Sequence, residues 1–200
     1  MHSPSPIPPV VPAGRMAAME QPVLDVPGTG LELRPWRPAD AGALIAAARD
    51  PAIHRWNRLP VETPEEARRR IDRMRERWHA ELSALWAVAR PGGEAIGLIG
   101  CGDIDLAGGS GEILYWLLPA ARGGGVAAQA TRRVSAWALD DLGLHRLRLC
   151  HSVGNPASCR VAGKAGFLLE GTMRGALLHA DGWHDQHLHA LVAGDLRPDA

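Results

Sequence analysis

The stretch Glu112-Ile-Leu-Tyr-Trp-Leu-Leu-Pro-Ala-Ala-Arg-Gly-Gly-Gly-Val-Ala-Ala-Gln-Ala-Thr131 decides the fold. It predicts an apolar strand, a turn through an arginine and three glycines, and the start of a long helix. The first turn of a helix has backbone N–H groups without intrahelical partners and carries the positive end of the helix dipole. Glycines let a ligand approach that backbone because they have no Cβ. The stretch therefore predicts a site for a ligand with phosphate groups.

Composition narrows the class of protein. The chain has 200 residues, which suits one domain with a proper core. Lysine plus arginine and aspartate plus glutamate both number 22, so net charge gives no argument for a nucleic-acid or membrane partner. No apolar run approaches the length of a membrane span, and the N-terminus lacks the pattern of a secretory signal. Cys101, Cys150 and Cys159 form no C-x-x-C pair, which favours a reducing compartment, and we expect a cytoplasmic protein.

Three segments are expected along the chain. Residues 1–28 are rich in proline and predict a disordered or polyproline-like tail. Residues 29–195 are expected to form the domain, and residues 196–200 a C-terminal tail. The domain begins with a strand over 31–36 and a helix over 40–49, capped by Asp40 and stopped by Pro51. A connector over 53–59 follows, and Thr63-Pro-Glu-Glu66 is a capping box that opens a second helix.

The centre of the chain predicts a mixed sheet. Strands over 84–89, 95–106 and 112–118 are separated by glycine-rich turns and predict an antiparallel meander. The helix after the glycines should run to about residue 142 and return the chain to a strand over 146–150, which favours a parallel neighbour. A short helix opened by Asn155 and a final hairpin over 167–192 complete the order. We expect an α+β fold with a mostly antiparallel sheet of about seven strands and helices on both faces.

Three phosphate ligands compete for the glycine loop. A nucleoside-triphosphate loop requires Gly-Lys-Ser/Thr, but Val126 and Ala127 follow the glycines here. A dinucleotide fingerprint is formally matched by Gly123, Gly125 and Ala128, yet the next strand ends without the acidic residue that would hold the ribose. The third ligand is the pyrophosphate of coenzyme A.

A family resemblance supports coenzyme A. Arg122-Gly-Gly-Gly-Val-Ala127 resembles the Q/R-x-x-G-x-G/A acyl-CoA loop of the GNAT N-acetyltransferases. Asn155-Pro-Ala-Ser-Cys-Arg-Val-Ala-Gly-Lys-Ala-Gly-Phe167 resembles the next block of that superfamily. Glu112-Ile-Leu-Tyr-Trp116, together with Glu170-Gly-x-x-Arg174 and Asp181-Gly-Trp-His-Asp185, is similar to the ribosomal-protein alanine N-acetyltransferase (RimJ/RimL) branch. The resemblance covers about residues 31–192.

The resemblance implies a GNAT fold and transfer of an acetyl group from acetyl-CoA to a primary amine by direct attack. The amine would belong to a protein N-terminus or to a small molecule. The resemblance also implies a set of cofactor-binding residues, in which the strand end pairs with the pantetheine arm and the loop holds the pyrophosphate. These residues are Leu117, Leu118, Arg122, Gly123, Gly124, Gly125, Val126, Ala127, Asn155 and Ser158.

Two residues are candidates for the chemistry. Glu112 is the candidate base for the incoming ammonium, and the simpler interpretation is a solvated residue at the start of a strand. Ser158 is the candidate hydrogen-bond donor to the departing sulfur, and the simpler interpretation is first-turn polarity after the Asn155 cap. Many members of the family have a tyrosine acid where this chain has Ala162. The only tyrosine is Tyr115, on an earlier strand, so the sequence disfavours a tyrosine acid.

Other functions remain open alternatives. The histidines His179, His184, His187 and His189 suggest a metal, but their spacing fixes no ligand geometry, so we expect no metal. A non-catalytic domain that binds acyl-CoA as a sensor or scaffold is one alternative function. An antibiotic or polyamine N-acetyltransferase is another. A homodimer is left open, and no nucleic-acid or membrane partner is expected.

Overall fold

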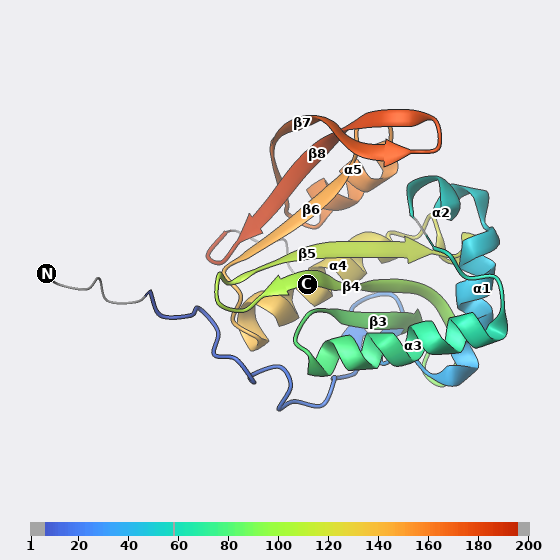
Figure 1. Cartoon of the computed structure of the whole chain (residues 1–200), viewed down its shortest axis with the longest axis horizontal. Coiled ribbons are helices and arrows are strands. Elements are labelled where there is room, and N and C mark those ends of the chain that lie inside the picture. Colours follow the sequence, from blue (N-terminus) through green and yellow to red (C-terminus); the bar gives the residue numbers. More distant parts are fainter. Residues whose placement is uncertain (1–6, 58, 196–200) are drawn as a thin grey trace, which may run out of the picture.

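The computed structural model describes residues 7–57 and 59–195, and it contains one eight-stranded sheet with helices packed on both faces (Figure 1). The strands are β1 (Leu24–Val26), β2 (Leu31–Arg34), β3 (Ala84–Ala89), β4 (Ala95–Asp105), β5 (Ser110–Leu117), β6 (Arg146–Ser152), β7 (Leu168–His179) and β8 (Gly182–Val192). The helices are α1 (Ala41–Arg49), α2 (Pro51–Trp56), α3 (Pro64–His79), α4 (Val126–Ala136) and α5 (Pro156–Lys164). Short turns η1 (Pro38–Asp40) and η2 (Pro119–Ala121) and a π-helical segment η3 (Trp137–Asp141) complete them.

The sheet confirms the predicted mixture of strand directions. Its order is β1-β2-β3-β4-β5-β6-β8-β7, and every neighbouring pair is antiparallel except β5 and β6. The parallel pair follows from the crossover through α4, because a helical connection returns the chain in the same direction. The prediction of about seven strands missed β1, which lies inside the segment expected to be a tail.

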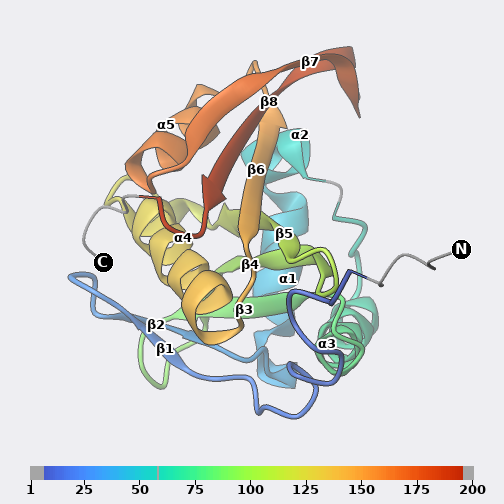
Figure 2. The ribbon, with the colours of Figure 1, turned by 90° about the vertical axis from the view of Figure 1, so that its left-hand side faces the viewer.

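Helices cover the two faces of the sheet differently. Figure 2 shows α4 and α5 on one side of the sheet and α1 and α3 on the other. The side of α4 holds a core that includes Trp86, Trp137 and Leu147, and the side of α1 holds a second core that includes Leu44 and Trp116. Among the described residues, no helix is both long and apolar enough to cross a membrane.

From residue 7 onward, the segment predicted to be a tail packs against the domain. Val11 and Met16 are buried, and β1 pairs with β2. Glu81, in a left-handed conformation with φ of 60°, accepts hydrogen bonds from the backbone N–H groups of Met16 and Ala17 at 2.7 and 3.0 Å. The high proline content therefore indicated a backbone without regular helices, but it did not mean that the segment lacks contacts. Prolines can also lie in an extended segment that packs against the domain. Residues 1–6 and the predicted tail at 196–200 lie outside the described residues.

The predicted helix signals had mixed outcomes. The Thr63 capping box is confirmed, because Thr63 and Glu66 exchange the expected hydrogen bonds. Helix α1 ends at Arg49, as predicted, and Pro51 opens a separate helix, α2, which extends into the connector predicted over 53–59. Its missing N–H group makes proline suitable for the first position of a helix.

Asp40 is the second difference in this region, because its side chain does not cap α1. It instead binds the buried Arg34 guanidinium through two contacts of 2.7 and 2.8 Å. Its carboxylate also accepts the backbone N–H groups of Arg37 and Ala95 at 2.8 and 3.1 Å. A buried arginine requires a paired charge, and that requirement prevails over capping.

Candidate functional site

The central feature of the site is the divergence of β5 from β6. The two strands pair only through Ser110, Gly111 and Glu112, opposite Arg146, Leu147 and Arg148. Beyond these residues β5 continues along β4 to Leu117, while β6 continues along β8 to Ser152. The unpaired ends diverge and leave a gap between the two halves of the sheet, as Figure 1 shows for β5 and β6.

The two residues of the strand end predicted to contact the cofactor, Leu117 and Leu118, direct their backbone groups to different sides. The Leu118 N–H donates to the Ile96 carbonyl at 2.9 Å, so this group is already used by β4. In an antiparallel ladder the hydrogen-bonding groups of successive residues point to opposite sides, so the Leu117 N–H points toward the gap. The Leu117 carbonyl accepts the Nε–H of Arg122 at 2.9 Å. The sequence prediction placed both leucines at the site, but only the backbone of Leu117 faces it.

The glycine loop lies at the open end of this gap. Gly123 and Gly125 have φ of 92° and 76°, which is the left-handed region that favours glycine. Gly125 precedes the first turn of α4 without any side-chain cap, and Gly123, Gly124 and Gly125 are all exposed. A Cβ built on any of the three would meet no atom within 4 Å in the part of the chain that the structure describes, so this part leaves the space in front of the loop open.

Arg122 is bound within the protein rather than extended toward this space. Its guanidinium donates to Asp50 Oδ1 at 2.7 Å and, as described, to Leu117. Asp50 also caps α2 by accepting the Ile53 N–H at 2.8 Å. The hydrogen bond from Arg122 lowers the pKa of the Asp50 carboxyl below its ordinary value. Arg122 therefore connects the glycine loop to the start of α2.

A cleft of about 480 Å³ joins the loop to α5. Most residues predicted to bind a cofactor line it, namely Leu117, Arg122, Gly123, Gly125, Val126, Ala127, Asn155 and Ser158. Asn155 caps α5, because its Oδ1 accepts the Ser158 N–H at 3.2 Å. Gly124 and Leu118 do not line this cleft among the described residues.

Several residues of the cleft were not predicted to bind a cofactor, and three of them matter for its chemistry. Arg160 and Lys164 lie on α5 four residues apart and line the cleft, and none of its described lining residues is acidic. Residues at that spacing share a helix face, and this signal was available in the sequence. Tyr115 also lines the cleft, and its buried hydroxyl has no hydrogen-bond partner of ordinary geometry among residues 7–57 and 59–195. Burial raises the pKa of Tyr115 to about 12, and the nearby Ser158 hydroxyl acts in the opposite direction.

Glu112 lies away from this cleft, at the paired end of the gap. Its Oε2 accepts the Nε–H of Arg148 at 2.6 Å, and Arg148 also contacts Asp103 at 3.2 Å. Hydrogen bonding to Glu112 raises the pKa of Arg148, although burial opposes the shift. The structure therefore brings Ser158 to the glycine loop but does not bring Glu112 there.

A second cleft meets the first at Trp56 and Asn57, which line both. It has a volume of about 1310 Å³ and lies between α2 and the tip of the β7–β8 hairpin. Its charged and titratable lining residues are Arg49, His54, Arg55, His179 and Asp181, so basic groups outnumber acidic ones.

A chain of hydrogen bonds lies next to Trp56. The Ser152 hydroxyl is 2.8 Å from His184 Nδ1, and His184 Nε2 is 2.9 Å from Asp181 Oδ1. The Ser152 oxygen accepts the Gly154 N–H at 3.1 Å, which leaves its proton for His184. This order corresponds to a neutral imidazole that donates to Asp181. The Trp56 ring contacts the His184 ring with centroids 6.2 Å apart.

Comparison with known proteins gives consistent results. Residues 30–168 match the family model described as an acetyltransferase (GNAT) domain. The putative ribosomal N-acetyltransferase YdaF of Bacillus subtilis (strain 168) is 32% identical over 116 residues, which are 58% of this chain and 63% of that protein. The match therefore spans less than two thirds of this relative.

Two further matches point in the same direction. The ribosomal-protein-serine acetyltransferase of Escherichia coli (strain K12) is 27% identical over 135 residues, which are 66% of this chain and 73% of that protein. The solved structure of Mycobacterium smegmatis RimJ in complex with CoA-disulfide has a TM-score of 0.77 at 24% identity and covers 90% of this chain and 89% of that one. At this identity the structural match establishes a common fold.

Proposed function

The chain belongs to the acetyltransferase (GNAT) family, and from this we propose that it transfers an acetyl group from acetyl-CoA to a primary amine. One observation carries the proposal. The gap between β5 and β6, the glycine loop before α4 and the capped start of α5 all face a single cleft. An extended cofactor with an anionic end and a thioester end needs this combination.

The residues of the cleft fit acetyl-CoA, which would supply the activated acetyl thioester. The exposed glycines leave room for a pyrophosphate against the N–H groups of the first turn of α4. Arg160 and Lys164 provide positive charge that Arg122 does not, since its guanidinium is engaged by Asp50. The Leu117 N–H, which points into the gap, would polarise the acetyl carbonyl.

We assign the return of a proton to the departing sulfur to Ser158 and Tyr115 together. Both line the cleft, and the phenol of Tyr115 carries its proton at neutral pH, as an unperturbed tyrosine does. Burial raises its pKa further, to about 12. A proton donor must still hold its proton when the thiolate leaves, and this condition is met. The sequence disfavoured a tyrosine as the general acid, but the structure makes Tyr115 of β5 a candidate for this role.

We assign proton removal from the incoming ammonium to His184. This imidazole packs against Trp56, which lines both clefts, and its Nδ1 can take a proton through the Ser152 hydroxyl. Asp181 would stabilise the imidazolium that forms. Glu112 stays a prediction as a base, but its carboxylate is bound by Arg148 at the paired end of the strands. His184→Gln should therefore lower kcat more than Glu112→Gln does.

The second cleft supports a protein N-terminus as the acceptor. Arg49, Arg55 and His54 line it, whereas Asp181 is its only acidic described residue. Polyamines and aminoglycosides carry several positive charges, and a basic lining repels them. A peptide whose amino group is followed by neutral or acidic residues fits better. The names of the relatives, which are ribosomal-protein acetyltransferases, agree with a polypeptide acceptor.

A panel of acceptors tests the function. Purified protein and acetyl-CoA are incubated with peptides that have acidic, neutral or basic N-terminal sequences, and with spermidine as a small polycation. Free thiol release and the mass of each product are measured. We expect acetylation of acidic and neutral peptides before basic ones or spermidine. Tight binding of acetyl-CoA without acetylation of any amine would favour the sensor alternative, and preferred acetylation of spermidine would overturn the acceptor assignment.

A further inference from the structure

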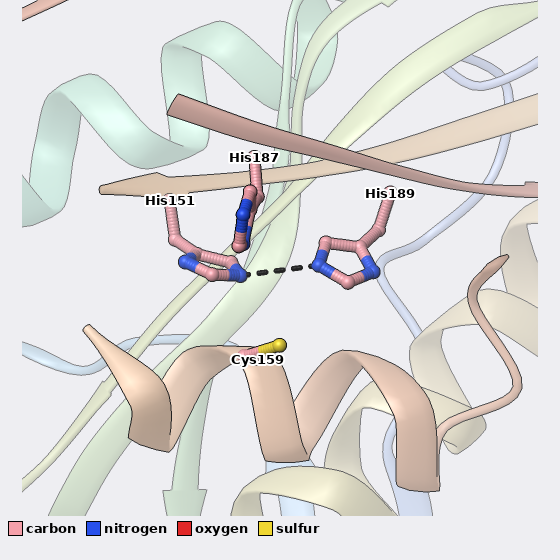
Figure 3. Close-up of side chains that lie close together, drawn as sticks. All are labelled: His151, Cys159, His187 and His189. Carbon is pink, nitrogen blue, oxygen red and sulfur yellow. Dashed lines mark hydrogen bonds between the residues drawn. The ribbon is translucent and has the colours of Figure 1, made fainter. Parts of the chain in front are cut away.

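A second cluster of reactive side chains lies outside the clefts. His151 of β6, His187 and His189 of β8 and Cys159 of α5 point toward one another between the sheet and α5 (Figure 3). Each offers one donor atom, and the four donor atoms lie within 4.8 Å of one another. We propose that these four residues bind a divalent transition-metal ion of the zinc class.

Sheet register explains how the histidines meet. His151 lies directly opposite His187 in the β6–β8 pair, and His187 and His189 share a face because they are two residues apart on a strand. The rings of His151 and His189 are stacked, with centroids 5.2 Å apart and an angle of 24° between their planes. Helix α5 crosses this face of the sheet and contributes Cys159 from the opposite side, as Figure 3 shows.

The distances agree with a tetrahedral site. Zinc lies about 2.0–2.1 Å from imidazole nitrogen and about 2.3 Å from thiolate sulfur, which separates donor atoms by roughly 3.4–3.6 Å in a tetrahedron. The Nε2 atoms of His151 and His189 are 3.2 Å apart. The widest separation in the cluster, 4.8 Å, is larger than ideal by an amount that side-chain rotation can remove.

Surrounding contacts prepare His151 for a metal. Its Nδ1 lies 2.8 Å from the backbone carbonyl of Ser152, which can only accept, so Nδ1 carries the proton. The unprotonated Nε2 therefore points into the cluster. Metal-bound histidines commonly donate their other ring nitrogen to a carbonyl in this way. In addition, Nδ1 of His187 is buried without a hydrogen-bond partner among the described residues.

The donor set defines the ion and its role. Three imidazoles and one thiol are typical ligands of zinc, and cobalt(II) can replace zinc in such geometry. On binding, the Cys159 thiol loses its proton to solvent and the sulfur forms a bond to the metal. All four positions are then filled by protein, which is the pattern of a structural rather than a catalytic site. The ion would fix α5, whose residues Ser158 and Arg160 flank Cys159, against the sheet.

Metal binding is tested on the full-length protein after removal of bound ions with a chelator. Cobalt(II) is titrated, and the visible bands of a tetrahedral ion and the near-ultraviolet thiolate-to-cobalt band are recorded. Zinc content per chain and the rise of Tm with added zinc are measured separately. We expect one ion per chain, the thiolate band, and a zinc-dependent rise in Tm.

Matched cysteine variants decide whether the site is the one described. Cys150→Ser is the control, because Cys150 precedes His151 on the strand and its side chain points to the other face. We expect Cys150→Ser to behave like the wild type. Cys159→Ser should lose the thiolate band, bind cobalt at least about tenfold more weakly, and respond less to zinc. The absence of a cobalt spectrum in the folded wild type, or equal behaviour of the two variants, would overturn the proposal.

Discussion

Replacing Gly125 by valine tests the placement of the cofactor most directly. Gly125 has φ of 76° and is exposed, and its Cβ would meet no atom of the described residues within 4 Å. The change therefore costs only backbone strain, about 1–2 kcal/mol for a residue in the left-handed region. For a protein of this size that corresponds to a fall in Tm of roughly 2–8 °C.

The effect of Gly125→Val on cofactor binding should be independent of its effect on Tm. Strain is present in both the free and the bound protein, so it does not change the affinity. The added side chain instead fills the open space before α4, where we place the pyrophosphate. We expect coenzyme A to bind at least about tenfold more weakly, a loss of about 1.4 kcal/mol. Isothermal titration calorimetry with coenzyme A measures the affinity, and circular dichroism measures Tm.

The chain offers a matched control in Gly92. This glycine of the β3–β4 turn has φ of 72°, is exposed and also has no atom within 4 Å of a built Cβ. Gly92→Val should lower Tm by a similar amount and leave the affinity for coenzyme A unchanged. If folded Gly125→Val protein bound coenzyme A within about twofold of the wild type, the pyrophosphate would not lie at this loop.

Three other changes have defined outcomes. Asp40→Ala leaves the buried Arg34 charge without its partner and should lower the free energy of unfolding by about 3–5 kcal/mol in a urea titration; an effect below about 1 kcal/mol would contradict the role of the pair. Burial raises the pKa of Asp40, but hydrogen bonds from Arg34 and two backbone N–H groups outweigh burial and hold the pKa below its ordinary value of 3.8. The stabilisation by the ionised Asp40 is therefore fully present above pH 3.8. It is lost as the pH falls through the lower pKa of the folded state. Tyr115→Phe should lower kcat by about 100-fold with little change in KM, and steady-state kinetics that show an unchanged kcat would remove Tyr115 from the proton path. Gly100→Ala places a Cβ closer to the Ala84 carbonyl oxygen than real Cβ atoms approach, so we expect a loss of stability of about 1–3 kcal/mol, and a Tm equal to the wild type would show that β3 and β4 can separate there.

Local motifs account for what could be predicted from sequence. The glycine loop and the Asn155 block each lie within a few residues of a strand or helix end, so their geometry depends on short-range rules. Both were predicted, and the structure places both at one cleft. The antiparallel meander followed equally from its turns.

Long-range pairings account for what was missed. The partner of Glu112 is Arg148, which meets it only through the short parallel ladder. Arg122 is engaged by Asp50, 72 positions away along the chain. The spacing of His187 and His189 was visible, but the register that adds His151 and the helix that adds Cys159 were not. No local pattern specifies such contacts, because they depend on how distant elements pack.

The N-terminal segment covers two buried tryptophans, so tryptophan fluorescence can report its position. The indole N–H groups of Trp78 and Trp86 donate to the backbone carbonyls of Met19 and Pro22 at 3.1 and 2.8 Å, and both rings contact Trp137. Release of the segment would remove β1 from the edge of the sheet and expose these indoles to water while strands β2 to β8 stay paired. Tryptophan emission of the unlabelled protein thus reports whether the strap formed by residues 10–26 is seated, separately from the folding of the domain beneath it.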